Sequence, residues 1–256
     1  RDWSSDVCSS DLHRSKSDAR AIRRGAPWIY DNEIVTDRRT KALTPGTIAV
    51  LEDAERAPLG LVAVNPASRI MARMLDRDAG ATIDPDWFAA RIARALELRA
   101  RLYDAPFYRL VHAEADGLPG VVIDRFDEIA VIQPNAAWAE TLLPALSEAV
   151  QAVTGVTTVL KNAGRRARGL EGLDARHAVL TGSAPDGPVP VPMNGATYLA
   201  DLTGGQKTGL FYDQRPNQAF AATLAREARV LDVFAHVGGF SLATLAAGAR
   251  HALAVD

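Results

Sequence analysis

The chain has 256 residues, 48% hydrophobic and 23% charged, which is typical of a soluble globular protein. No stretch approaches the roughly 20 apolar residues of a membrane-spanning helix, and no charged-then-apolar start indicates secretion. The single cysteine, Cys8, excludes an internal disulfide, so we expect a cytoplasmic protein. The net charge of −2 does not indicate a nucleic-acid-binding protein, and the five dispersed histidines do not predict a metal site.

The basic residues are almost all arginine, since only four of the 29 are lysine. Arginine suits phosphate recognition and base stacking. The codon bias of a GC-rich genome explains the same excess without any function. Both explanations stay open at this point.

Both ends of the chain are unusual. Residues 1–12 are polar, without apolar periodicity, and part of them resembles a translated sequencing adapter. We expect them to be non-native or disordered and leave them out of the fold prediction, which also removes Cys8 as a candidate nucleophile. At the other end, Asp256 directly follows an apolar run, which predicts an interrupted protein.

Residues 13–78 predict a small strand-rich domain. The runs 47–53 and 59–66 contain β-branched residues and are bounded by proline and glycine, and 69–75 is a third candidate strand. Short strands with few helices must pack as a compact sheet or barrel to protect their edges. We expect Trp28 to belong to the core of this domain and not to a base-stacking surface.

Residues 80–193 predict an α+β domain. Asp84 and Pro85 are typical of a helix start, with a capping side chain followed by proline at the first helical position. Three short strands follow, the first containing His112. A second helix near 137–153 should be kinked or split by Pro144, and a further strand comes at 156–162.

A basic loop, residues 164–173, follows that strand. Its arginines could bind RNA phosphates, and a solvated loop without a ligand explains them equally well. The candidate RNA-binding residues are Arg165, Arg166 and Arg168.

Residues 194–256 begin with a hairpin at Asn194-Gly195 and end as strand, glycine turn, helix and strand. Gly238 and Gly239 would let a ligand approach the backbone N–H groups at the helix start. Asp256 lies 18 residues after Gly238, a spacing typical of an acidic residue that accepts hydrogen bonds from a ribose. Asp232 suits a ligand with an ammonium group, as in S-adenosylmethionine. An ordinary strand–helix connection is the alternative.

The segment 203–215 precedes this unit. Lys207 and Thr208 could contact a carboxylate, and Phe211 or Tyr212 could stack on an adenine or shape its pocket. In the alternative, the segment is a solvated loop in which Asp213 and Arg215 form a local ion pair.

The segments 25–34, 115–126, 166–173, 204–217 and 230–243, with the final Ala-Val-Asp, carry a resemblance. Together they resemble the class I S-adenosylmethionine-dependent methyltransferases that form 5-methylcytosine in large-subunit ribosomal RNA. The resemblance implies a PUA-like RNA-binding domain, a central α+β domain and a Rossmann-like methyltransferase domain, which match residues 13–78, 80–193 and 194–256. It implies S-adenosylmethionine as cofactor and ribosomal RNA as partner, and it leaves a homodimer open.

The resemblance also implies site residues. Asp256 would hold the ribose of the cofactor, and His236 and Val237 stand where the family often has a tyrosine–threonine pair. The residues that would lie along the cofactor are Asp232, Phe234, Gly238, Gly239 and Phe240. The residues that would lie beside the cofactor are Lys207, Thr208, Phe211, Asp213 and Arg215.

Catalysis in this family uses a cysteine thiolate that adds to the cytosine ring, together with an Asp-Pro-Pro motif further along the chain. The sequence has neither after residue 8, so we expect this piece not to catalyse and residues 216–256 to be poorly held. The alternative is a catalytically inactive RNA-binding protein with a PUA-like domain. A nicotinamide-dependent enzyme is less suitable, because the aromatic segment near Phe211 has no evident use there.

Overall fold

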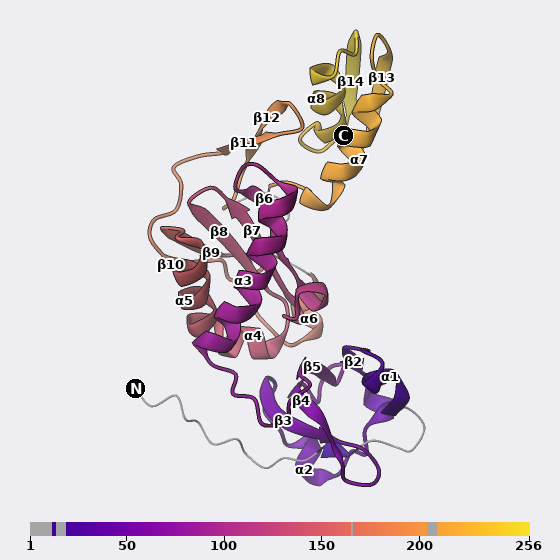
Figure 1. The fold of residues 1–256 in the computed structure, drawn as a ribbon, viewed down its shortest axis with the longest axis vertical. Coiled ribbons are helices and arrows are strands. Elements are labelled where there is room, and N and C mark those ends of the chain that lie inside the picture. The colour runs from indigo at the N-terminus through magenta and orange to yellow at the C-terminus, as the bar shows by residue number, and fades with distance from the viewer. Residues whose placement is uncertain (1–11, 14–18, 165, 204–208) are drawn as a thin grey trace.

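The computed structural model describes residues 12–13, 19–164, 166–203 and 209–256. These residues form an elongated molecule, with a small β domain at one end, a central α+β domain, and a two-stranded α/β unit at the other end (Figure 1). In the described part of the chain, no helix is both long and apolar enough to cross a membrane.

The first domain is built on a five-stranded sheet of order β1-β3-β4-β5-β2. Its strands are antiparallel except for the parallel pair β1–β3. The predicted strands are confirmed, with the third shifted a few residues along the chain. The elements are β1 (Leu12–His13), α1 (Ala19–Arg23), β2 (Trp28–Ile29), η1 (Asp31–Glu33), α2 (Arg38–Lys41), β3 (Thr47–Glu52), β4 (Pro58–Val64) and β5 (Ala72–Asp76).

Trp28 does not lie in the core of this domain, so that expectation is wrong. Its side chain is on the edge strand β2, with 39% of the residue exposed. The indole Nε1 donates a hydrogen bond of 2.7 Å to Glu114 Oε1 in the central domain. The core is formed instead by aliphatic side chains such as Ile29, Leu51 and Val62.

The central domain has a second five-stranded sheet, of order β10-β9-β8-β7-β6, with helices α3 and α5 packed together on it (Figure 1). The strands are antiparallel except for the parallel pair β8–β9. The elements are α3 (Pro85–Leu102), β6 (Phe107–His112), η2 (Ala113–Asp116), β7 (Val121–Phe126), β8 (Ile129–Pro134), α4 (Ala137–Thr141), α5 (Leu143–Thr154), β9 (Thr158–Lys161), α6 (Arg166–Leu170) and β10 (Ala178–Thr181).

Two predicted helix features of this domain are confirmed. The Asp84 side chain caps α3 by accepting a hydrogen bond of 2.8 Å from Trp87 N. The second helix is split at Leu142 into α4 and α5, and Pro144 lies in the first turn of α5, where its missing N–H costs nothing. His112 is a strand residue, as expected, and it ends β6.

The remaining elements begin with the predicted hairpin. Asn194 and Gly195 have φ of 53° and 77°, as its turn requires. Tyr198 and Tyr212 pack with Phe126 of the central sheet in one apolar cluster, which attaches this part to the central domain. The elements are β11 (Val189–Met193), β12 (Ala196–Ala200), η3 (Tyr212–Gln214), α7 (Arg215–Thr223), β13 (Arg229–Val233), α8 (Gly239–Ala246) and β14 (His251–Val255).

The strand–turn–helix–strand unit is confirmed, with β13 and β14 paired in parallel. Its sheet carries large exposed apolar side chains: Leu231 is 63% exposed, Leu253 53% and Val255 47%. A sheet of this kind normally has about five to six strands, which bury such side chains.

Candidate functional site

A cavity of about 320 Å³ lies between η3 and the turn that connects β13 to α8. Its walls come from two short segments, 210–214 and 234–240, with Gln218 of α7. Five of the residues predicted to bind a cofactor line this cavity: Phe211, Asp213, Phe234, Gly239 and Phe240.

Asp232, near the end of β13, does not line the cavity but bonds the first turn of α8. The residue is buried, and its Oδ2 accepts hydrogen bonds from Ser241 N at 3.0 Å and from Ser241 Oγ at 2.9 Å. These bonds tie the end of β13 to the first turn of α8. In the structure Asp232 shapes the turn, and its contact with the ammonium group of a ligand stays a prediction.

Gly239 is held closely on two sides. A Cβ added to it would lie 2.3 Å from Gln218 Nε2, so glycine lets this buried side chain of α7 reach the turn. The hydroxyl of Tyr198 donates a hydrogen bond of 3.0 Å to Gly239 O. The glycine therefore joins the hairpin, α7 and α8 at one point.

The backbone of the turn is strained. Phe234, His236 and Gly238 have φ of 62°, 51° and 71°, although only the last is glycine. Such left-handed conformations cost non-glycine residues about 1–3 kcal/mol and cluster at ligand sites. Phe234, one of these residues, lines the cavity and is 87% exposed.

Asp256 lies beside the turn at the end of β14. Its Oδ1 accepts a hydrogen bond of 3.1 Å from His236 N. The His236 ring packs edge-on against Phe211, with ring centroids 4.9 Å apart at 83°. The contacts bring the predicted ribose-binding carboxylate and the predicted aromatic residue to the same turn.

Arg215 does not belong to this cavity. Its Nη1 donates a hydrogen bond of 3.0 Å to Phe107 O, and its guanidinium carbon lies 4.3 Å from the centre of the Tyr103 ring. The side chain therefore attaches α7 to the central domain, and its contact with a cofactor stays a prediction. Lys207 and Thr208 lie outside the described residues.

The candidate RNA-binding arginines separate into different environments. Arg168 is 1% exposed, and its guanidinium bonds Pro134 O, Glu140 Oε2 at 2.9 Å and Asp174 O at 2.8 Å. Its expected contact with RNA is therefore wrong, because a buried guanidinium cannot reach a phosphate. Arg166 is exposed on α6, and Arg165 lies outside the described residues.

Gln218 is one of the cavity residues that were not predicted from the sequence, together with Leu210, Gln214 and Ala235. It is 5% exposed and accepts a 3.5 Å hydrogen bond from Asn194 Nδ2 through its Oε1. Its contact with Gly239 joins two separate elements, so no local pattern marks it. Among the described residues, no group of three or more His, Cys, Asp or Glu side chains is arranged to hold a metal ion.

Comparison with known protein families gives two matches. Residues 15–77 match a PUA-like domain, and residues 148–256 match the S-adenosylmethionine-dependent methyltransferase family. The chain is therefore similar to the class of methyltransferases that combine these two parts, and the two matches confirm the predicted fold class of a PUA-like β domain followed by an α/β methyltransferase region.

Within that class, the chain is similar to Ribosomal RNA large subunit methyltransferase I. It is 32% identical to the protein of this name from Cronobacter sakazakii over 245 residues, 94% of this chain and 61% of the relative. It is 35% identical to the Alteromonas mediterranea protein over 240 residues, 93% of this chain and 60% of the relative. The chain thus spans about 60% of the length of these curated relatives.

Solved structures share the fold. A candidate S-adenosylmethionine-dependent methyltransferase from Streptococcus mutans superposes with a TM-score of 0.80 at 18% identity, covering 96% of this chain and 63% of the other. A second candidate methyltransferase, complexed with SAH, gives a TM-score of 0.81 at 18% identity, covering 96% and 62%.

Proposed function

We propose that the protein containing this chain transfers a methyl group from S-adenosylmethionine to large-subunit ribosomal RNA. The observation that carries the proposal is the cavity at the carboxyl ends of the parallel strands β13 and β14. Nucleotide ligands bind in this position in open α/β sheets. The match of residues 148–256 to S-adenosylmethionine-dependent methyltransferases supports the same ligand.

The residues around the cavity fit the parts of this cofactor. Asp256 uses one carboxylate oxygen for His236 N, and a carboxylate has further lone pairs that can accept from ribose hydroxyls. Phe211 and the exposed Phe234 offer aromatic faces for the adenine. The N–H groups at the start of α8 suit the carboxylate of the methionine part. Lys207 and Thr208 remain predicted contacts.

The chemistry divides between cofactor and protein. When bound, S-adenosylmethionine supplies an electrophilic methyl group. The described residues bind and orient it: Asp232 fixes the turn through Ser241, and Gln218 packs against Gly239. The target, cytosine carbon 5, is inferred from the family resemblance, in which a thiolate further along the chain activates the base.

The RNA partner is inferred from the match of residues 15–77 to a PUA-like domain and from the names of the relatives. Arg166 remains a candidate phosphate contact because it is exposed. Ribosomal RNA as substrate implies a cytoplasmic protein.

Binding of S-adenosylhomocysteine, measured by calorimetry on the complete protein, tests the cofactor site. Asp256→Asn should weaken binding about tenfold or more, because it removes a charged acceptor from the ribose. Asp186→Asn, at an exposed loop position, is the matched control and should bind like the parent. Equal binding by the Asp256 variant would contradict the assigned site.

Methyl transfer is tested with labelled S-adenosylmethionine and naked large-subunit ribosomal RNA, followed by mass spectrometry of the nucleosides. We expect 5-methylcytidine. Label in another nucleoside would contradict cytosine carbon 5 as the target and would still support methyl transfer to RNA. RNA binding that is indifferent to cofactor, with no label transferred, would favour a catalytically inactive RNA-binding protein.

A further inference from the structure

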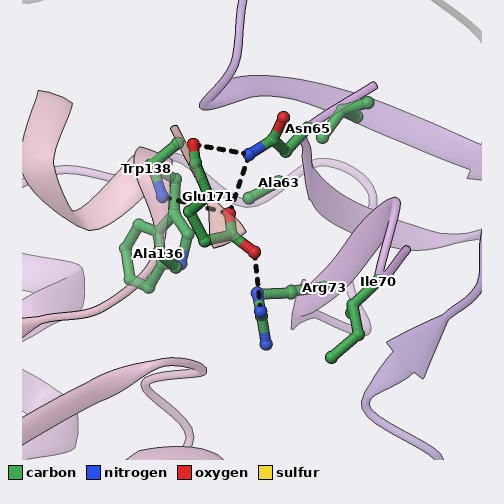
Figure 2. Close-up of a pocket in the computed structure, with 9 residues that line it drawn as sticks. Ala63, Asn65, Ile70, Arg73, Ala136, Trp138 and Glu171 are labelled. Carbon is green, nitrogen blue, oxygen red and sulfur yellow. Dashed lines mark hydrogen bonds and ion pairs between the residues drawn. The ribbon is translucent and has the colours of Figure 1, made fainter. Parts of the chain in front are cut away.

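Glu171 is a buried carboxylate at the domain interface, the surface where the first domain meets the central domain (Figure 2). It directly follows α6, and both of its carboxylate oxygens accept hydrogen bonds. Oε1 accepts from Ser68 Oγ at 3.0 Å and from Arg73 Nη2 at 2.9 Å. Oε2 accepts from Asn65 Nδ2 at 2.9 Å and from Ala137 N at 3.5 Å.

Three of these four donors belong to the first domain. Asn65 follows β4, Ser68 lies in the β4–β5 connection and Arg73 is on β5. The Asn65 amide is oriented by its own loop, because its Oδ1 accepts from Ala67 N at 3.1 Å. Its Nδ2 also donates to Glu171 O at 3.1 Å. One central-domain residue therefore binds two residues of the β4–β5 connection, Asn65 and Ser68, and Arg73 of β5.

The main chain of Glu171 is itself fixed in the central domain. Arg168, buried among central-domain acceptors, lies three residues earlier, and Glu171 N donates a 3.0 Å hydrogen bond to Arg168 O. The segment 166–173 therefore fixes Arg168 within the central domain and presents the Glu171 side chain to the first domain.

Two other carboxylates cross the interface. Glu114 accepts from Trp28 and Arg73, and Asp76 accepts from Trp87 and Arg91. Their side chains are 22% and 20% exposed, whereas that of Glu171 is 4% exposed. Because solvent weakens exposed ion pairs, Glu171 is the contact most sensitive to a change of domain orientation.

We propose that Glu171 is a positioning residue that holds the PUA-like domain in one orientation on the central domain. A rotation small enough to keep the interface closed would separate the Glu171 carboxylate from Asn65, Ser68 and Arg73 without letting water replace them, which is strongly unfavourable. The functional consequence rests on the proposed function: RNA on the PUA-like domain would meet the methyltransferase domain in a fixed geometry.

Distance measurements between spin labels test the orientation without RNA or cofactor, so their outcome is independent of the proposed function. Labels are attached through Ala54→Cys in the β3–β4 turn and Ala152→Cys on α5, both exposed, in a Cys8→Ser background. The parent should give one narrow distance distribution. Glu171→Gln should broaden it, because either amide rotamer turns an NH₂ group toward existing donors.

Glu148→Gln is the matched control, since Glu148 is an exposed glutamate on α5, and it should leave the distribution narrow. Asn65→Asp alone should also broaden it, because two carboxylates would then face each other. The double variant with Glu171→Gln should narrow it again, since the glutamine NH₂ can donate to the new carboxylate while its oxygen accepts from Ser68 and Arg73.

A parent-like distribution for Glu171→Gln would overturn the proposal, because the apolar contacts of the interface would then suffice. Failure of the double variant to narrow the distribution would overturn it as well. If Glu171→Gln does not fold, Ser68→Ala removes a single donor and is followed by hydrogen exchange. Peptides covering 65–72 should then exchange faster while β7 stays unchanged, and unchanged exchange in both would overturn the proposal.

Discussion

Arg168→Ala is expected to destabilise the central domain strongly, although its sequence context predicts a surface contact with RNA. The guanidinium is 1% exposed and donates to Glu140 Oε2, Pro134 O and Asp174 O. Truncation removes all three bonds and leaves these acceptors facing an empty space in the protein interior. The perturbation is therefore a loss of buried polar partners, together with a cavity.

The magnitude follows from the partners that remain. Removing one member of a buried ion pair typically costs about 3–5 kcal/mol. Glu140 keeps Lys161 as a partner, and its side chain is 28% exposed, so water can reach it. We therefore expect the lower end of that range, about 3 kcal/mol.

Urea unfolding followed by tryptophan fluorescence measures this loss, because Trp138 is buried in the same domain. With a slope of about 3 kcal/mol per molar urea, the midpoint should fall by about 1 M. Arg166→Ala is the matched control: it is exposed in the same short helix and should change stability by less than about 0.5 kcal/mol. If Arg168→Ala lowers the free energy of unfolding by less than about 1 kcal/mol, the structural role is refuted. If the variant instead loses RNA affinity at unchanged stability, Arg168 is a phosphate-binding residue after all.

Three further predictions concern stability, measured by urea unfolding. Asp84→Ala should lower the free energy of unfolding by about 1 kcal/mol, because it removes the capping side chain that accepts the hydrogen bond from Trp87 N. Gly60→Ala should cost at least about 2 kcal/mol, since φ is 140° and the added Cβ would lie 2.2 Å from Asp76 O. Burial, reinforced by a nearby carboxylate, raises the pKa of Tyr212 well above its usual 10.0. Its stabilising contribution is therefore complete below pH 10 and is lost as pH rises further, and Tyr212→Phe should reduce that loss.

The features that the sequence predicts correctly are those whose cause is local. The cap of α3 depends on Asp84 and the three residues after it, and the hairpin turn depends on Asn194 and Gly195. The cavity walls are likewise two short continuous segments, 210–214 and 234–240, so five of the expected cofactor-binding residues meet there. Each signal is complete within a few positions of the chain, where backbone propensity and side-chain reach decide the outcome.

The wrong expectations concern side chains whose partners are distant in the sequence. Trp28 bonds Glu114, 86 positions away, and Arg168 bonds Glu140, 28 positions away. An arginine in a sequence reveals its charge but not its burial, which depends on the acceptors that the fold assembles around it. Gln218 was missed for the same reason, because only the packing of α7 against α8 brings it to Gly239.

The excess of arginine over lysine has a structural explanation in addition to codon bias or RNA binding. Arg99 donates to both oxygens of Asp116 at 2.8 and 2.7 Å, and Arg109 bonds both oxygens of Asp124 at 2.8 and 3.3 Å. A planar guanidinium can make such paired contacts, whereas an ammonium group cannot match the two oxygens in this way. Some of the arginines therefore form ion pairs within the protein, so the total number of basic residues overestimates the RNA-binding surface. A search for the RNA contact should start from exposed arginines that have no carboxylate partner among the described residues, and Arg166 is one candidate.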